Sequence, residues 1–191
     1  MNFIKKEYYD EIFENLNISN QTIKSIEFDD CSFKNCIFNT SILQHCKFTE
    51  CTFENCDLSL MKPKGSVFND IKISNSKAIG INWTLCNKPF EVNFESSDIS
   101  MSSFYELDLR HTKIISCKAN DIDFGKTNLE KVNFKDTDLK GTIFGDTNLK
   151  DTDLRFATNY LIDPQNNFLK GTKVTLPQAN SFLEFLDIKI T

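Results

Sequence analysis

The chain has 191 residues, a length that suits one domain, and its 40% hydrophobic and 26% charged residues permit a packed core and exclude wholesale disorder. Acidic residues exceed basic ones by 27 to 22, which argues against direct binding to nucleic acid or to an anionic membrane surface. The sequence has neither an apolar run of membrane-spanning length nor an N-terminal signal segment, so we expect a cytoplasmic protein with no membrane partner.

Residues 1–15 carry only a weak pattern. Phe13 would fit the repeat that follows, but Glu11 would then occupy a position that faces the interior. A carboxylate is costly to bury without a partner. We therefore expect residues 1–15 to form a cap over the N-terminal end of the domain.

An apolar residue, usually a large one, recurs every five residues through residues 16–85, and Pro63 is the exception. The centres of these units are Ile18, Ile23, Phe28, Phe33, Phe38, Leu43, Phe48, Phe53, Leu58, Pro63, Phe68, Ile73, Ala78 and Trp83. A helix repeats every ~3.6 residues and a strand every ~2, so a period of five needs a chain that turns a corner in each unit. Such a chain predicts a solenoid, in which each coil buries its apolar side chains against its neighbours.

Small residues, many of them cysteine, occupy the position two residues before these centres. The cysteines in this position are Cys31, Cys36, Cys46, Cys51, Cys56 and Cys117. Their spacing does not match the two-residue gap of zinc sites, so we interpret them as small buried thiols and expect no metal. Cys86 lies outside the series and is the one cysteine that we expect to be reactive.

Residues 86–91 interrupt the repeat, because this segment is one residue longer than a unit. It consists of Cys86, Asn87, Lys88, Pro89, Phe90 and Glu91. The simplest interpretation is one imperfect unit with a single-residue bulge. Such a bulge would kink the rod and turn its two halves relative to each other, and a tolerated local irregularity is the alternative.

The period of five resumes at Phe94 and continues to Leu154, which predicts the second half of the solenoid over residues 92–156. The residue before the centre is here usually Asp or Asn, as in Asp98, Asn128 and Asp153. Short side chains of this kind hydrogen-bond to nearby backbone in turns. We therefore expect them to stabilise the corners.

Residues 157–191 differ from the repeat and form the C-terminal tail. Ala179, Phe182, Leu183 and Leu186 follow the spacing of a short amphipathic helix, which Thr175 and Pro177 would introduce, and residues 187–190 resemble a terminal strand. The tail carries more apolar side chains than one exposed end requires, so we expect a homodimer interface, with a monomer cap as the alternative. The expected interface residues are Phe182, Phe185, Leu186, Ile188 and Ile190.

Units such as Thr147-Asn148-Leu149-Lys150-Asp151 resemble the pentapeptide-repeat family, whose pattern is a small residue, Asp or Asn, Leu or Phe, and two free positions. The resemblance covers residues 16–85 and 92–156. It implies an all-β fold, a right-handed quadrilateral β-helix with four units per coil, here followed by a short C-terminal amphipathic helix. Residues 157–164 and the tail are similar to the Qnr-like and microcin-immunity-like branch. That branch implies homodimeric rods that imitate duplex DNA, bind DNA gyrase or topoisomerase IV, and protect it from quinolones or peptide toxins.

With four units per coil, residues twenty apart would share one face of the rod, which predicts two acidic stripes. The N-terminal stripe would contain Glu27, Asp29, Asp30, Glu50 and Asp70, and the C-terminal stripe Glu106, Asp123 and Asp146. Lys47 and Lys126 are the basic residues expected beside them. These stripes would bind a basic groove on a partner, and an ordinary solvated surface is the alternative.

Sequence motifs for catalysis are missing. His45 and His111 lie far apart, and the chain has no glycine-rich phosphate loop, nucleophile motif or pair of carboxylates at catalytic spacing. We therefore expect no catalytic residue and no cofactor. The expected function is a non-catalytic protein-interaction rod that binds DNA gyrase or topoisomerase IV as a DNA mimic, and the alternative is a scaffold for another cytosolic protein.

Overall fold

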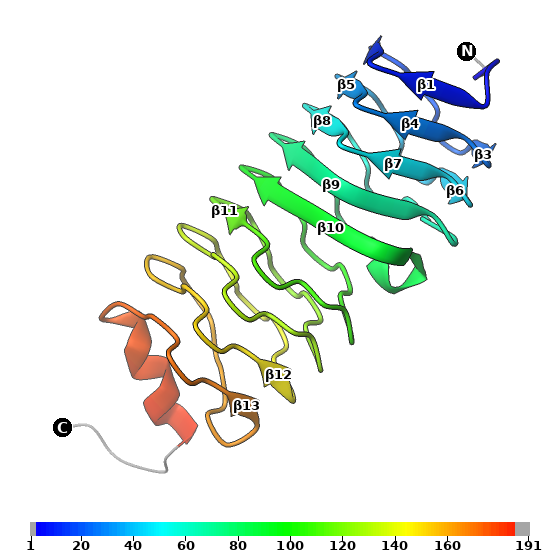
Figure 1. The fold of residues 1–191 in the computed structure, drawn as a ribbon. Helices are drawn as coiled ribbons and strands as arrows, with labels where there is room; N and C mark the ends of the chain where they lie inside the picture. Colours follow the sequence, from blue (N-terminus) through cyan, green and yellow to red (C-terminus); the bar gives the residue numbers. More distant parts are fainter. Residues whose placement is uncertain (1–2, 186–191) are drawn as a thin grey trace.

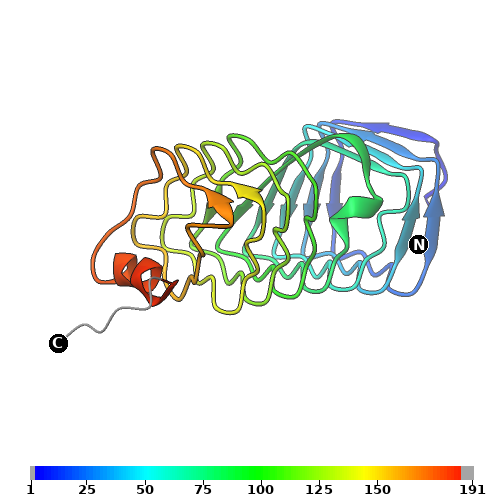
Figure 2. The same ribbon diagram turned by 90° about the horizontal axis from the view of Figure 1, so that it is seen from below.

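The computed structural model describes residues 3–185 and shows a parallel β-solenoid of about eight turns with one short helix at its C-terminal end (Figure 1). When the rod is turned by 90° and seen from below, the coils stack side by side along the rod and the helix lies beyond the last coil (Figure 2). The expected fold class, a right-handed quadrilateral β-helix with a C-terminal helix, is confirmed. No helix among the described residues is long and apolar enough to cross a membrane.

The corners of the solenoid explain its period. The residue two positions after a centre usually has left-handed backbone, with φ between 49° and 65° in the residues other than glycine. This conformation disfavours most side chains, and here it recurs because the ladder holds each corner: the N–H of Asp30, for example, donates to the carbonyl of Thr49 at 3.0 Å. One such residue in every five turns the chain often enough to close a four-sided coil.

Asp and Asn before the centre stabilise the corners, as expected. A side-chain oxygen of Asp57 accepts the N–H of Ser59 at 2.9 Å, and Asp123 does the same for Gly125 at 2.9 Å. Several N-terminal units carry other residues at this position, such as Glu27 and Lys47, and these units form three-residue strands instead. The sequence thus accounts for the concentration of strands in the N-terminal half.

All strands pair in parallel, and most pairs join residues twenty apart. The main sheet runs in the order β1-β4-β7-β9-β8-β5-β2, with β10 and β11 added at β9, and two further pairs are β3-β6 and β12-β13. The strand bounds are β1 Glu7–Tyr9, β2 Ile12–Glu14, β3 Thr22–Lys24, β4 Glu27–Asp29, β5 Ser32–Lys34, β6 Ile42–Gln44, β7 Lys47–Thr49, β8 Thr52–Glu54, β9 Val67–Ser74, β10 Asn87–Glu95, β11 Ile114–Ile115, β12 Thr147–Asn148 and β13 Asn167–Phe168. Two short 3-10 helices complete the described part of the chain, η1 Trp83–Leu85 and η2 Gln178–Phe185.

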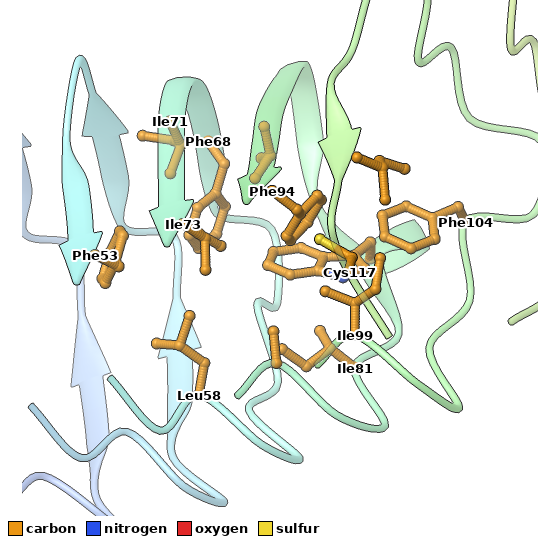
Figure 3. Close-up of a cluster of buried hydrophobic side chains, with 14 of the residues drawn as sticks. Phe53, Leu58, Phe68, Ile71, Ile73, Ile81, Phe94, Ile99, Phe104 and Cys117 are labelled. Carbon is orange, nitrogen blue, oxygen red and sulfur yellow. The ribbon is translucent and has the colours of Figure 1, made fainter. Parts of the chain in front are cut away.

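The centres form columns of buried side chains inside the rod. The ring of Phe48 stacks on Phe28 with 4.9 Å between centroids and on Phe68 with 5.0 Å. Another column continues past residues 86–91, because Phe53 pairs with Ile73 and Ile73 with Phe94, and all three point into the interior (Figure 3). The apolar core is therefore continuous along both halves.

The expected single-residue bulge lies in β10. Its pairing with β9 shifts twice: Asn87 pairs with Val67 at a separation of twenty residues, Phe90 with Phe68 at twenty-two, and Val92 with Ile71 at twenty-one. From Phe94, which pairs with Ile114, the separation is again twenty. The extra residue is therefore absorbed inside residues 87–92, and a turn between the two halves of the rod stays a prediction.

The solenoid begins earlier than we expected. Strands β1 and β2 pair in register with β4 and β5, so residues 7–14 belong to the first coil and not to a cap. Glu11 fits its inward position because the terminal coil is open on one side, where its carboxylate meets the ammonium group of Lys5 at 2.8 Å. The ring of Phe3 covers this end, with its centroid 5.6 Å from that of Tyr8 and 5.1 Å from that of Phe28.

The solenoid also ends later than residue 156. Asp153 bridges to Lys173, and β12 pairs with β13, so the segment up to Lys173 continues the coil. The helix that follows is a 3-10 helix, and the hydroxyl of Thr175 accepts the N–H of Phe156 at 3.2 Å instead of capping the helix. The expected terminal strand over residues 187–190 lies outside the described residues.

Candidate protein-interaction surface

Acidic residues follow one another along one corner of the N-terminal half. We name this set the acidic corner: Asp10, Asp30, Glu50, Asp70 and Glu91. The first four have left-handed backbone with φ from 50° to 53°, and the N–H groups of Asp10 and Glu50 each donate to the next coil at 3.0 Å. Glu91 extends the set beside Asp70, because Val92 pairs with Ile71. The ladder therefore places one exposed carboxylate on each of five successive coils.

The acidic corner is not neutralised from within the chain. None of its five carboxylates forms an ion pair with any of residues 3–185, and the nearby ammonium groups bind other acids. Lys47 lies 3.7 Å from Glu27, and Lys72 lies 2.8 Å from Glu95, where its hydrogen bond lowers the pKa of that carboxyl group. Successive coils are ~4.8 Å apart, so the carboxylates repel one another within the ~8–10 Å screening length of physiological salt. Their charge is left available for a basic partner.

The structure brings together part of the expected N-terminal stripe. Asp30, Glu50 and Asp70 lie in the acidic corner, whereas Glu27 and Asp29 lie on the outward face of β4. Asp10 and Glu91 also belong to the acidic corner and were not among the expected residues. Asp10 lies twenty residues before Asp30, but it falls within residues 1–15, for which we expect a cap. Glu91 was hidden because the bulge moves it twenty-one residues beyond Asp70.

The expected C-terminal stripe is not continuous. Glu106, Lys126 and Asp146 share one corner of successive coils, so Lys126 occupies the coil between the two acids, and its ammonium group lies 3.5 Å from Glu106. Asp123 lies on the preceding side, where its carboxylate accepts the N–H of Gly125. This half of the rod therefore presents paired charges at that corner, unlike the acidic corner.

The cysteines are buried as free thiols. The six in the small position lie in the core, and the thiol of Cys51, for example, donates to the carbonyl of Phe28 at 3.5 Å. Burial raises the pKa of Cys51 to about 12 and also raises that of Cys86, which is half-buried. A raised pKa disfavours the thiolate, so it does not support the expected reactivity of Cys86. Within residues 3–185, no group of three or more His, Cys, Asp or Glu side chains is placed to hold a metal ion.

The expected dimer interface is described only in part. Phe182 and Phe185 are half-buried, and the ring of Phe182 lies 5.9 Å from that of Tyr160 in the last coil. Phe182 therefore helps to cover its own solenoid. Leu186, Ile188 and Ile190 lie outside the described residues.

Comparison with family models shows to which protein family the chain belongs. The model of the pentapeptide repeat region matches residues 87–159, and that of pentapeptide repeats, in eight copies, matches residues 26–60. The first match includes the bulge, the second lies before it, and together they span more than half of the sequence. The chain belongs to the pentapeptide-repeat family.

Solved structures of other pentapeptide-repeat proteins share this solenoid. One trypsin-treated form of QnrB1, a plasmid-mediated fluoroquinolone resistance protein, matches with a TM-score of 0.63 and 16% identity over 97% of this chain and 100% of its own. HetL, involved in heterocyst differentiation regulation in the cyanobacterium Nostoc sp. strain PCC 7120, matches with a TM-score of 0.71 and 13% identity over 87% and 84%. At these identities the likeness shows the fold alone. A comparison with curated proteins finds no significant match.

Proposed function

We propose that this pentapeptide-repeat protein is a non-catalytic rod whose acidic corner binds a basic groove on a protein partner. The observation that carries this proposal is the row of five exposed carboxylates on successive coils, none of them paired within residues 3–185. The backbone ladder holds these residues at fixed spacing, so little order is lost on binding. Complementary charge would also speed the encounter with a basic partner.

The partner that we propose is DNA gyrase or topoisomerase IV, whose basic groove binds duplex DNA. The resemblance to the Qnr-like branch and the shared fold with QnrB1, a fluoroquinolone resistance protein, support this choice. The acidic corner carries one charge per ~4.8 Å of rod, against one per ~3.4 Å along a single DNA strand. It therefore imitates one strand at lower charge density, which favours modest and salt-sensitive binding that modulates quinolone or toxin sensitivity.

A scaffold for another cytosolic protein is the second candidate. The fold shared with HetL, a protein involved in heterocyst differentiation regulation, supports it, because the same solenoid there belongs to a protein that is not described as a quinolone resistance protein. In either case we propose that two copies join through their C-terminal tails. Phe185 is half-buried in the described part of that tail, and such a dimer would place an acidic corner on each arm of a longer rod.

A supercoiling assay with purified gyrase, with and without ciprofloxacin, tests the choice of partner. We expect the wild-type protein to inhibit supercoiling or to relieve the drug, and the double variant Glu50→Lys/Asp70→Lys to lose the effect. Glu54→Lys/Asp136→Lys is the matched control, because it changes the net charge equally at exposed or half-exposed positions outside the acidic corner.

The two candidates give different results. If a large molar excess of wild-type protein neither inhibits gyrase nor relieves the drug, the topoisomerase proposal is wrong. A pull-down from host extract, carried out with the same charge variants, then tests the scaffold. A partner retained equally by wild type and by Glu50→Lys/Asp70→Lys at low salt would show that the acidic corner is not the binding surface.

A further inference from the structure

A groove of about 1010 Å³ lies where the coil with the bulge faces the next coil. Residues 84–91 form one wall and residues 105–112 the other, and we name this place the open rung. Strand β10 forms part of the first wall and lies beside β9 in the middle of the rod (Figure 1). The extra residue at the bulge therefore coincides with a large opening in the side of the solenoid.

The backbone ladder is interrupted on the first wall. On one edge β10 pairs with β9 from Asn87 to Glu95, but on its other edge only Phe94 and Glu95 pair, with β11. At the end of the opening, the N–H of Lys113 donates to the side-chain oxygen of Asn93 at 2.9 Å instead of to a backbone carbonyl. Residues 87–92 therefore present a free strand edge to the groove.

The facing wall has an unused donor. In the following coils the N–H of Asn128 donates to the carbonyl of Leu107 at 2.9 Å, and that of Asn148 donates to Thr127 at 3.1 Å. Asp108 occupies the same position one coil earlier, and its N–H makes no backbone hydrogen bond within the described chain. Asp108 is exposed, so this N–H is open to solvent and available to a carbonyl group of an added strand.

The floor of the open rung is apolar. Leu107 occupies the small inward position that Thr127 and Thr147 fill one and two coils later. Those threonines are fully buried, whereas Leu107 is only half-buried, and so are Cys86 and Phe90 beside it. Water therefore reaches apolar groups that regular coils would cover, and an apolar side chain placed there would bury them.

One carboxylate of the open rung favours a basic ligand. Of the three acidic side chains on its walls, Asp108 is bound to Arg110 at 2.8 Å and Glu106 to Lys126 at 3.5 Å, so Glu91 is the one that forms no ion pair with any of residues 3–185. Glu91, the last residue of the acidic corner, lies on the wall, so the row of carboxylates leads from the rod surface directly into the groove.

We propose that the open rung binds an extended segment of a basic protein partner by strand addition. The segment would form backbone hydrogen bonds with residues 87–92 or with Asp108, would place an apolar side chain on Leu107, and would direct lysine or arginine residues towards Glu91 and the acidic corner. Strand addition obtains affinity from the main chain and specificity from alternate side chains. This inference rests on the proposed function only in its choice of a basic partner.

A random 12-residue peptide library displayed on phage, selected against the full chain, tests this proposal. We expect enriched peptides with an apolar residue flanked by Lys or Arg, and synthetic copies should bind in fluorescence anisotropy. Leu107→Thr, which restores the residue type of the next coils, and Glu91→Lys should each weaken binding about ten-fold. Asp136→Lys, an exposed corner away from the groove, is the control. Methylation of alternate peptide nitrogens should also weaken binding about ten-fold.

Hydrogen exchange provides a readout that does not depend on the variants. Residues 105–112 should exchange faster than residues 125–132 in the free protein, and the selected peptide should slow them. Failure to enrich peptides, or equal affinity for wild type and a folded Leu107→Thr variant, would overturn the proposal. If peptides bind here while gyrase is unaffected, the topoisomerase proposal fails and the open rung stands.

Discussion

Replacement of Phe48 by alanine tests the central packing argument. Phe48 is fully buried in the middle of a column, with Phe28 stacked 4.9 Å to one side and Phe68 stacked 5.0 Å to the other. Its ring also meets the edge of Phe33 at 6.0 Å. The backbone ladder fixes the distance between coils, so the neighbouring rings cannot collapse into the cavity.

The expected loss follows from these contacts. Phe→Ala changes in protein cores cost about 3–5 kcal/mol, and each lost aromatic pair accounts for about 0.5–1.5 kcal/mol beyond the buried area. Because Phe48 loses two stacked partners in a site that cannot close, we expect a loss of about 4–5 kcal/mol in the free energy of unfolding. Phe156→Ala is the control, because Phe156 is 57% exposed at a corner and should change stability by no more than about 0.5 kcal/mol.

Urea unfolding measures both variants. Far-ultraviolet circular dichroism measures the loss of the backbone ladder as a whole. The fluorescence of the single tryptophan, Trp83, measures unfolding at a buried site that follows Phe68 in the sequence. A loss below about 1 kcal/mol for Phe48→Ala, or an equal loss for Phe156→Ala, would show that stacked columns do not hold the coils together.

Two further predictions concern pH and assembly. Burial raises the pKa of Cys51 from 9.0 to about 12 and that of Cys117 to about 11, so the folded chain keeps both protons while the unfolded chain loses them. The free energy of unfolding should therefore be fully retained below pH 9 and fall as the pH rises towards about 12. Urea titrations under reducing conditions should show a smaller fall for Cys51→Ala. If the free energy of unfolding of Cys51→Ala falls with pH as steeply as that of wild type, the argument is contradicted. Sedimentation equilibrium at tens of micromolar should give the mass of a dimer for the full chain, and a monomer at that concentration would refute the tail interface.

The period of five was enough to predict the fold. Every unit repeats the same local rule, so Phe28, Phe33 and their successors could be assigned to the interior without knowledge of any distant contact. The role of Asp57 and Asp123 in the corners was equally local, because each binds an N–H only two residues away. The left-handed corner backbone was not predicted, since residues as different as Asn35, Leu60 and Phe156 adopt it and only the ladder imposes it.

The sequence by itself therefore determined the solenoid, its buried columns and its free thiols, because these depend on alternation within five residues. The tertiary structure alone decided where the solenoid begins and ends, which charges are left unpaired, and where the ladder opens. Those properties depend on which side chain lies one coil away. A single inserted residue at the bulge changes which residues lie opposite each other in neighbouring coils. The placement of Glu91 and the exposure of Leu107 follow only from the way the neighbouring coils accommodate this residue.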